Sequence, residues 1–290
     1  MTATALALVL AAALLHATWN LSLKQSPRKL LVSWLSLLVG PLLASPGLFL
    51  LAGGPGIGPA GWACVVATAL LHALYFLFLS EAYERGELSL VYPLARGSGS
   101  LLVALLAPLL LGEVLTPGGA TGIGLVVLGV FGVAGGPGPT RPGQSRLLAQ
   151  WRTLHVALAF LTGLTIAAYS LVDKVGVVLV HPYLYQILMM EGAFAALTPY
   201  VLWRQRPSVA ALKAEWRAVA VVGILSFAAY QLVLVALRLA KVAYVVAARE
   251  VSIVFGAALG AAFLAERHGP RRILAAASIA AGLVLIGLSR

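Results

Sequence analysis

Apolar runs of about 20 residues follow one another along almost the whole sequence, with only short breaks between them. A helix of this length crosses the hydrocarbon core of a bilayer, which is about 30 Å thick. Of the 290 residues, 61% are hydrophobic and 10% are charged, whereas about 25% of the residues in soluble domains are charged. The composition excludes a soluble domain and predicts an all-α integral membrane protein.

Hydropathy and helix breakers divide the chain into about ten predicted transmembrane helices. A linker rich in proline, glycine and arginine at 137–151 separates an N-terminal half, 1–136, from a C-terminal half, 152–290. We expect the spans at 4–23, 30–52, 59–80, 89–111, 118–135, 152–171, 182–203, 217–239, 242–264 and 271–289.

Polar landmarks recur in the two halves. Arg96 and Glu113 have nearly the same separation as Arg249 and Glu266, which indicates an internal duplication. Since each half has an odd number of spans, the second half is inverted relative to the first. The sequence therefore predicts two inverted five-helix repeats.

Arg96 and Arg249 are cations inside apolar spans, where a charge costs at least about 2.5 to 3.5 kcal/mol. Each lies roughly 10 Å deep, and the two approach the midplane from opposite faces. Because arginine binds carboxylate or phosphate oxygens at two points, we interpret both as substrate-binding residues. The alternatives are that each snorkels to its interface, or forms a structural ion pair with Glu191 or Glu250.

Glu250 and Glu191 are candidates for proton coupling or for contact with a substrate ammonium group. Glu250 follows Arg249 directly, and its other possible role is to neutralise Arg96. Glu191 lies near the middle of a predicted span, where a bare carboxylate has to be protonated or paired. A purely structural role is the alternative for Glu191.

Other polar side chains on these helices are candidates for the cavity wall. His16 and Asn20 share one face of the first helix, with Trp19 alongside. Lipid cannot form hydrogen bonds with these polar side chains, so water or protein has to do so. Tyr169 stands at the position of Trp19 in the second half, and Ser252 shares the face of Arg249.

Glycine and proline suggest where the helices bend and pack. Pro93 and Gly97 flank Arg96 and are candidates for a conformational hinge. Glycines spaced four apart allow close helix packing, within one chain or in a homodimer. They occur as Gly118 with Gly122 and as Gly256 with Gly260.

The formal net charge of +11 comes from Lys and Arg scattered through short loops. This distribution favours anionic lipid headgroups as partners, and not nucleic acid. When loops are assigned to alternating sides, most of the basic residues fall on one side. The positive-inside rule then places both termini outside the cytoplasm.

The sequence has no enzyme signature. It contains no HExxH, no Walker A loop and no G-x-S-x-G motif. Its single cysteine, Cys64, lies in an apolar run, so it provides neither a disulfide framework nor a cysteine metal site. We expect no catalytic residues, no metal and no cofactor.

With these duplicated halves, the sequence resembles the EamA-type ten-helix transporters of the drug/metabolite transporter superfamily. The resemblance rests on His16–Asn20, Tyr92–Gly97, Gly112–Glu113, Arg249–Phe255 and Ala265–Arg267. It implies a bacterial-type inner-membrane protein with a central cavity between the halves. It also implies alternating access driven by a proton gradient or by exchange. Cytoplasmic termini are usual in this superfamily, in contrast to the charge count here.

The combined prediction is a secondary active transporter of a small anionic or zwitterionic metabolite, such as an amino acid, an organic acid or a phosphonate-like compound. One alternative is an exporter of lipophilic or cationic drugs. A second is a non-transporting membrane subunit or a component of a lipid-carrier flippase.

Overall fold

The computed structural model describes residues 1–51, 56–85, 88–134, 154–255 and 270–289. Almost all of these residues are helical and none lies in a strand, which confirms the predicted all-α class. The α-helices are α1 (Ala3–Gln25), α2 (Lys29–Ala44), α3 (Pro59–Arg85), α4 (Leu88–Leu111), α5 (Pro117–Ala134), α7 (Leu154–Leu179), α8 (Pro182–Gln205), α9 (Val209–Leu239), α10 (Val242–Arg249) and α12 (Pro270–Leu288), and a 3-10 helix, η1, spans Ser45–Leu51.

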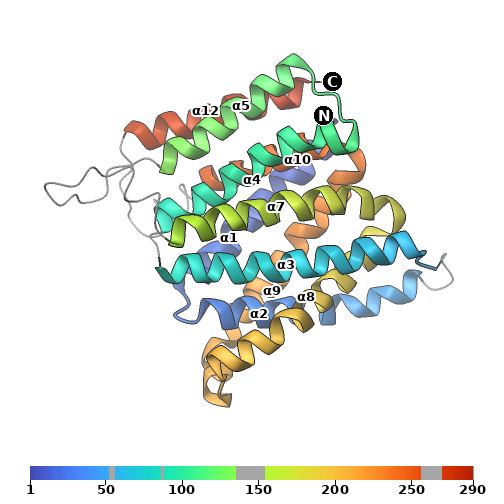
Figure 1. Cartoon of the computed structure of the whole chain (residues 1–290), viewed down its shortest axis with the longest axis vertical. Helices are drawn as coiled ribbons and strands as arrows, with labels where there is room; N and C mark the ends of the chain where they lie inside the picture. Colours follow the sequence, from blue (N-terminus) through green and yellow to red (C-terminus); the bar gives the residue numbers. More distant parts are fainter. Residues whose placement is uncertain (52–55, 86–87, 135–153, 256–269, 290) are drawn as a thin grey trace, which may run out of the picture.

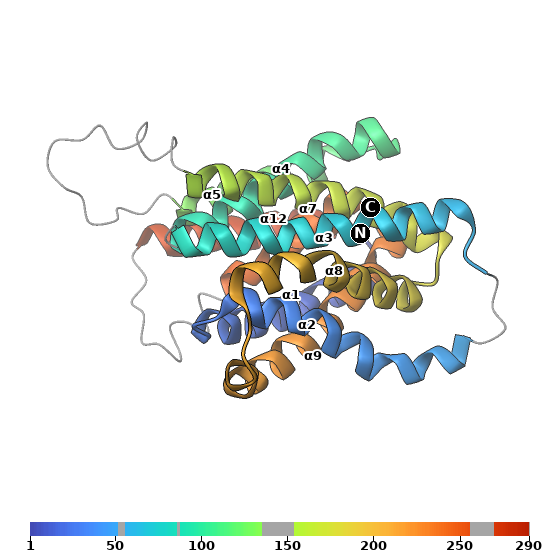
Figure 2. The same cartoon turned by 60° about the horizontal axis from the view of Figure 1, so that its bottom comes forward.

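The helices form one bundle in which long apolar elements lie side by side (Figure 1, Figure 2). Among the described residues, six segments are long and apolar enough to cross a membrane, and they correspond to α1, α2 with its extension, α3, α4, α7 and α9. The apolar stretches of α5 and α12 are shorter. Many leucine, valine and tryptophan side chains remain exposed on the bundle surface, as lipid contact requires. The chain is a multi-pass membrane protein.

The packing of the helices repeats when the two halves are exchanged. Helix α1 packs on α9 as α7 packs on α3, and α2 contacts α9 as α8 contacts α3. The pairs α2 with α8 and α5 with α12 join equivalent helices of the two halves. Helix α1 begins at the end of the bundle that holds both termini, whereas α7 ends there (Figure 1). These relations confirm two inverted five-helix repeats.

Glycines bring α5 and α12 into backbone contact. A Cβ atom added to Gly282 would lie 2.4 Å from the carbonyl oxygen of Gly122, and one on Gly118 would lie 3.2 Å from Ser289 Oγ. The first predicted glycine pair therefore packs within the chain, against α12. The second pair, Gly256 and Gly260, lies outside the described residues.

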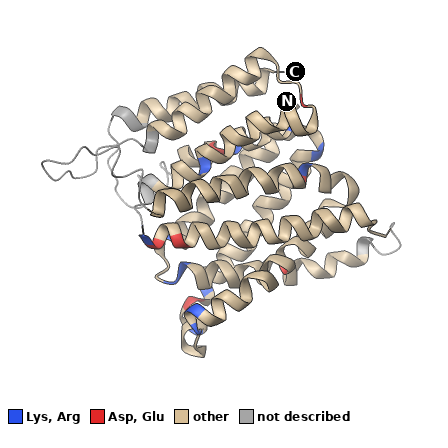
Figure 3. Cartoon of the chain, in the orientation of Figure 1, with Lys and Arg blue, Asp and Glu red and all other residues tan. Residues whose placement is uncertain are grey.

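Several Lys and Arg residues lie at the end of the bundle opposite the termini (Figure 3). The turns at that end carry Arg28, Arg85, Arg204 and Arg206. The predicted linker at 137–151 and the landmark Glu266 lie outside the described residues.

Candidate functional site

A narrow cavity lies inside the bundle, between the two repeats. The first repeat contributes side chains from α1, α2 and α3, and the second from α7, α8, α9 and α10. Half of the lining residues are aromatic, and one is an arginine. It consists of Ala12, His16, Trp19, Leu37, His72, Tyr75, Phe76, Tyr169, Met190, Ser226, Ala229, Tyr230, Val233 and Arg249.

Aromatic rings from three helices pack together along this wall. The His72 ring stacks on Tyr169 with centroids 4.1 Å apart, and it meets Tyr230 edge-on at 5.2 Å. Tyr75 approaches Tyr169 edge-on at 5.9 Å. Since each ring contacts another, α3, α7 and α9 hold these side chains in fixed relative orientations.

Arg249 is the cation of the cavity. It ends α10, is only 7% exposed, and its guanidinium carbon lies 5.6 Å from the centroid of the Tyr230 ring. Among the described residues, no carboxylate forms an ion pair with it. Its described neighbours include the Tyr230 ring and the Tyr169 hydroxyl, neither of which carries a formal negative charge, so the guanidinium can still donate hydrogen bonds to an anion.

Arg96, in contrast, is neutralised within the protein. Its Nε lies 3.0 Å from Glu250 Oε2 and its Nη2 lies 3.0 Å from Glu250 Oε1. Ser100 Oγ donates to Glu250 Oε1 over the same distance, 3.0 Å. All three residues are buried. Arg96 and Glu250 therefore form a structural ion pair, and neither lines the cavity.

The helix that carries Arg249 is interrupted at Glu250, beside this ion pair. Helix α10 ends at Arg249, Glu250 forms a turn, and the helix resumes at residues 251–255. The continuous span that we expected at 242–264 is therefore interrupted between the two charged residues. Arg249 faces the cavity, whereas Glu250 contacts Arg96 and Ser100 of α4.

The structure does not bring three other candidates into the cavity. Asn20 Nδ2 donates to the carbonyl oxygen of His16 one turn earlier, at 2.8 Å. Ser252 is buried but is absent from the cavity lining. Glu191 is exposed on the outer surface of α8. Because α8 is apolar around much of its circumference, its sequence pattern does not reveal which side faces the protein.

Two buried polar atoms at the cavity have no hydrogen-bond partner among the described residues. They are Nε2 of His16 and Nε1 of Trp19, whose rings meet edge-on with centroids 4.7 Å apart. A buried polar atom without a partner is costly. Both atoms are therefore available to a ligand, in agreement with the placement predicted for His16 and Trp19.

The proposed hinge residues lie within an unbroken helix. Helix α4 continues through Pro93 from Leu88 to Leu111. A Cβ atom on Gly97 would approach the side chains of Val130 and Phe131 to 3.2 Å. Gly97 thus allows close packing of α4 on α5, and its role as a hinge remains a prediction.

Sequence reasoning missed much of the aromatic wall. His72, Tyr75 and Tyr230 were not among the residues predicted for the cavity wall. A signal was present, because Tyr75 stands 21 residues before Arg96 and Tyr230 stands 19 residues before Arg249. The duplication could have identified the two tyrosines as equivalent cavity residues.

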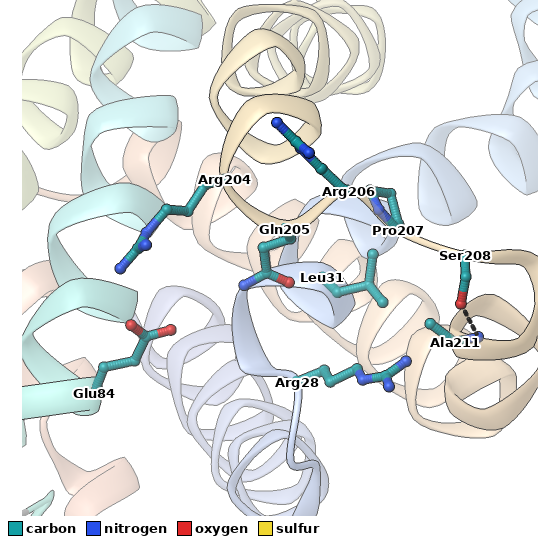
Figure 4. Close-up of a pocket in the computed structure, with 9 residues that line it drawn as sticks. All are labelled: Arg28, Leu31, Glu84, Arg204, Gln205, Arg206, Pro207, Ser208 and Ala211. Carbon is teal, nitrogen blue, oxygen red and sulfur yellow. Dashed lines mark hydrogen bonds between the residues drawn. The ribbon is translucent and has the colours of Figure 1, made fainter.

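A second hollow lies at the basic end of the bundle (Figure 4). It is lined by Arg28, Leu31, Glu84, Arg204, Gln205, Arg206, Pro207, Ser208 and Ala211. The guanidinium groups do not converge. Arg204 extends toward Glu84, whereas Arg28 extends toward Ala211 (Figure 4).

The two halves of the chain can be compared with known families. Residues 3–135 and 153–288 each match the EamA-like transporter family. The chain belongs to this family. The resemblance recognised in the sequence is therefore confirmed over both repeats of this EamA-like protein, and with it the membership of the drug/metabolite transporter superfamily.

A solved crystal structure shares the fold of this EamA-like protein, with a TM-score of 0.77 at 20% sequence identity over 99% of each chain. At this identity the likeness concerns the fold alone. No protein with a curated description matches the sequence.

Proposed function

We propose that this EamA-like protein is a secondary active transporter of small organic anions, and that Arg249 binds the acidic group of the substrate. Alternating access exposes the central cavity to one side of the inner membrane and then to the other. The two inverted repeats are the elements that move relative to each other. The protein acts without enzymatic chemistry.

The observation that carries the proposal is the difference between the two buried arginines. Glu250 neutralises Arg96 through two contacts of 3.0 Å, whereas Arg249 faces the cavity without a carboxylate partner among the described residues. The substrate site therefore has one available positive charge. An anion that enters it gains charge-assisted hydrogen bonds in a region of low dielectric constant.

The cavity-lining residues other than Arg249 determine which anions bind. Its rings offer flat apolar surface, and Trp19 Nε1 offers a donor that has no partner among the described residues. The described lining contains no carboxylate that could hold an ammonium group. These features favour a monoanion with a planar or apolar body, such as an aryl carboxylate, over a zwitterion or a cationic drug.

The orientation that we propose follows from the basic turns. Arg28, Arg85, Arg204 and Arg206 lie at one end of the bundle, and the positive-inside rule assigns that end to the cytoplasm. Both termini then lie outside the cytoplasm. Anionic lipid headgroups contact the basic turns on the inner side.

A charge-preference measurement tests the proposed function. Purified protein in proteoliposomes is assayed for uptake of a panel of aryl carboxylates and of arylamines with the same ring systems, with protein-free liposomes as the control. We expect carboxylates to be transported and the matched amines to be excluded. Preferential transport of the amines contradicts the proposal and favours the cation exporter. Failure to transport any panel member, together with stoichiometric co-purification of a second protein, favours the non-transporting subunit.

A further inference from the structure

Asp173 is the only aspartate of the chain, and it is fully buried in α7. Its Oδ1 accepts hydrogen bonds from Thr68 Oγ1 at 2.5 Å and from Tyr185 Oη at 2.8 Å. Its Oδ2 accepts a hydrogen bond from the hydroxyl of Tyr230. Four helices, α3, α7, α8 and α9, thus supply the carboxylate and its three hydroxyl partners.

No basic side chain of the described residues forms an ion pair with Asp173. The neighbouring Lys174 turns away, and its Nζ donates to the carbonyl oxygens of Leu237 and Ala240 at 2.6 and 2.7 Å. The titratable and charged groups that face Asp173 are Cys64 and His72 on α3, Tyr169 on α7, Tyr185 on α8 and Tyr230 on α9, with Arg249 on α10 reached through Tyr230.

Two members of this network also line the cavity. Tyr230 donates to Asp173 while its ring faces the Arg249 guanidinium. His72 Nδ1 lies 3.1 Å from Thr68 Oγ1, the atom that contacts Asp173. Direct contacts therefore connect the Asp173 carboxylate to the wall of the cavity.

We propose that Asp173 is a proton-binding site whose protonation state is transmitted to the substrate cavity through Tyr230. Hydroxyl groups both donate and accept hydrogen bonds, so the same partners satisfy Asp173 with or without a proton. A fixed cation would hold the carboxylate in its ionised state, but no cation of the described residues forms an ion pair with Asp173. A hydronium ion of the aqueous phase supplies the proton, so one O–H bond forms on the carboxylate and one water molecule is left.

The added proton changes the role of Tyr230. A protonated Asp173 oxygen can no longer accept the Tyr230 hydrogen bond in the same way, so the tyrosine hydroxyl becomes an acceptor or is released. The Tyr230 ring supports Arg249, and its movement alters the anion site. This last step rests on the proposed function, whereas the proton site does not.

Because Asp173 is the sole aspartate, labelling the protein with aspartate that carries carbon-13 in the side-chain carboxyl isolates one signal. Full-length protein in lipid bilayers is titrated from about pH 9 to about pH 5, and carbon-13 NMR reports the protonation state. If Asp173 binds a proton as proposed, the signal passes from the ionised to the protonated position as the pH falls. A signal that keeps one protonation state throughout overturns the proposal.

The Tyr230→Phe variant tests the connection to the cavity. The variant removes one hydrogen-bond donor to the ionised carboxylate, so the proton affinity of Asp173 should increase by about tenfold or more. Thr68→Val, which removes another donor, should act in the same direction. Tyr244→Phe is the control, because the Tyr244 hydroxyl contacts Thr116 and not Asp173. Unchanged proton affinity in Tyr230→Phe overturns the proposed route.

A second experiment distinguishes failure of the proton site from failure of the proposed anion transport. Benzoate is added to the labelled wild-type protein and to Tyr230→Phe during the titration. A titration of Asp173 that benzoate leaves unchanged supports the proton site and contradicts its coupling to an anion. A benzoate-dependent change in wild type that Tyr230→Phe abolishes supports both the site and its coupling.

Discussion

Arg96 and Glu250 meet in a buried, two-point ion pair that joins α4 of the first repeat to the end of α10 in the second. Both nitrogen–oxygen distances are 3.0 Å, and Ser100 adds a third donor to the carboxylate. The pair joins the two repeats, and Glu250 neutralises the charge of Arg96. Arg249 is thereby left as the cation of the cavity.

Breaking this pair should destabilise the protein. In Arg96→Gln or Glu250→Gln a buried charge loses its partner, which typically costs about 3 to 5 kcal/mol. We expect either variant to unfold at a lower temperature in detergent. The double variant Arg96→Gln/Glu250→Gln should recover part of the loss, since no unpaired charge remains. A double variant as unstable as the sum of the single variants contradicts a direct pair.

Glu113 should stabilise the start of α10. Its Oε1 accepts from the backbone N–H of Val242 at 2.7 Å, and its Oε2 accepts from that of Ala243 at 3.3 Å. Loss of such a cap costs about 0.5 to 2 kcal/mol. We expect Glu113→Ala to increase hydrogen exchange at these two amides. Glu84→Ala, an exposed acid at the opposite end, is the control; equal exchange in both variants would refute the cap.

The contact between α5 and α12 should not tolerate a methyl group. In Gly282→Ala the new Cβ would meet the carbonyl oxygen of Gly122, and such overpacking costs about 1 to 3 kcal/mol. Gly124→Ala is the matched control, because nothing lies within 4 Å of its Cβ position. Thermal unfolding should distinguish the two. A stable Gly282→Ala protein would argue against the close approach of these helices.

The proposed orientation predicts which end of the bundle is accessible from the cytoplasm. On a Cys64→Ser background, a cysteine at exposed Ala214, near the basic end, should react only with a reagent that reaches the cytoplasm. A cysteine at Val178, near the other end and 68% exposed, should react from outside the cell. The reverse labelling pattern would place both termini in the cytoplasm.

Much of the architecture could be predicted from the sequence. The apolar runs predicted the spans, and the spacing of Arg96 and Glu113 against Arg249 and Glu266 predicted the duplication. These signals are strong because a bilayer imposes a minimum helix length and an odd number of spans imposes inversion. The break after Arg249 was not predicted, since neither proline nor glycine marks it.

The cavity itself was predicted only in part. Lipid is as apolar as the protein interior, so hydropathy does not tell which side of a membrane helix is buried. Glu191 was therefore placed by depth alone, and the structure has it on the outer surface. The partners of Asp173 lie on three other helices, and Thr68 is 105 residues away. Sequence spacing along one helix cannot reveal such contacts.

The most direct test of the central claim is equilibrium binding of an aryl carboxylate to Arg249 variants. Loss of a charge-assisted contact worth about 1.5 to 3 kcal/mol should weaken binding roughly 10- to 100-fold in Arg249→Gln. Arg249→Lys should retain part of the affinity, because the charge remains without the planar fork. Arg238→Gln, which removes an exposed arginine at the end of α9, should bind like wild type. Wild-type affinity in a folded Arg249→Gln protein would contradict the account.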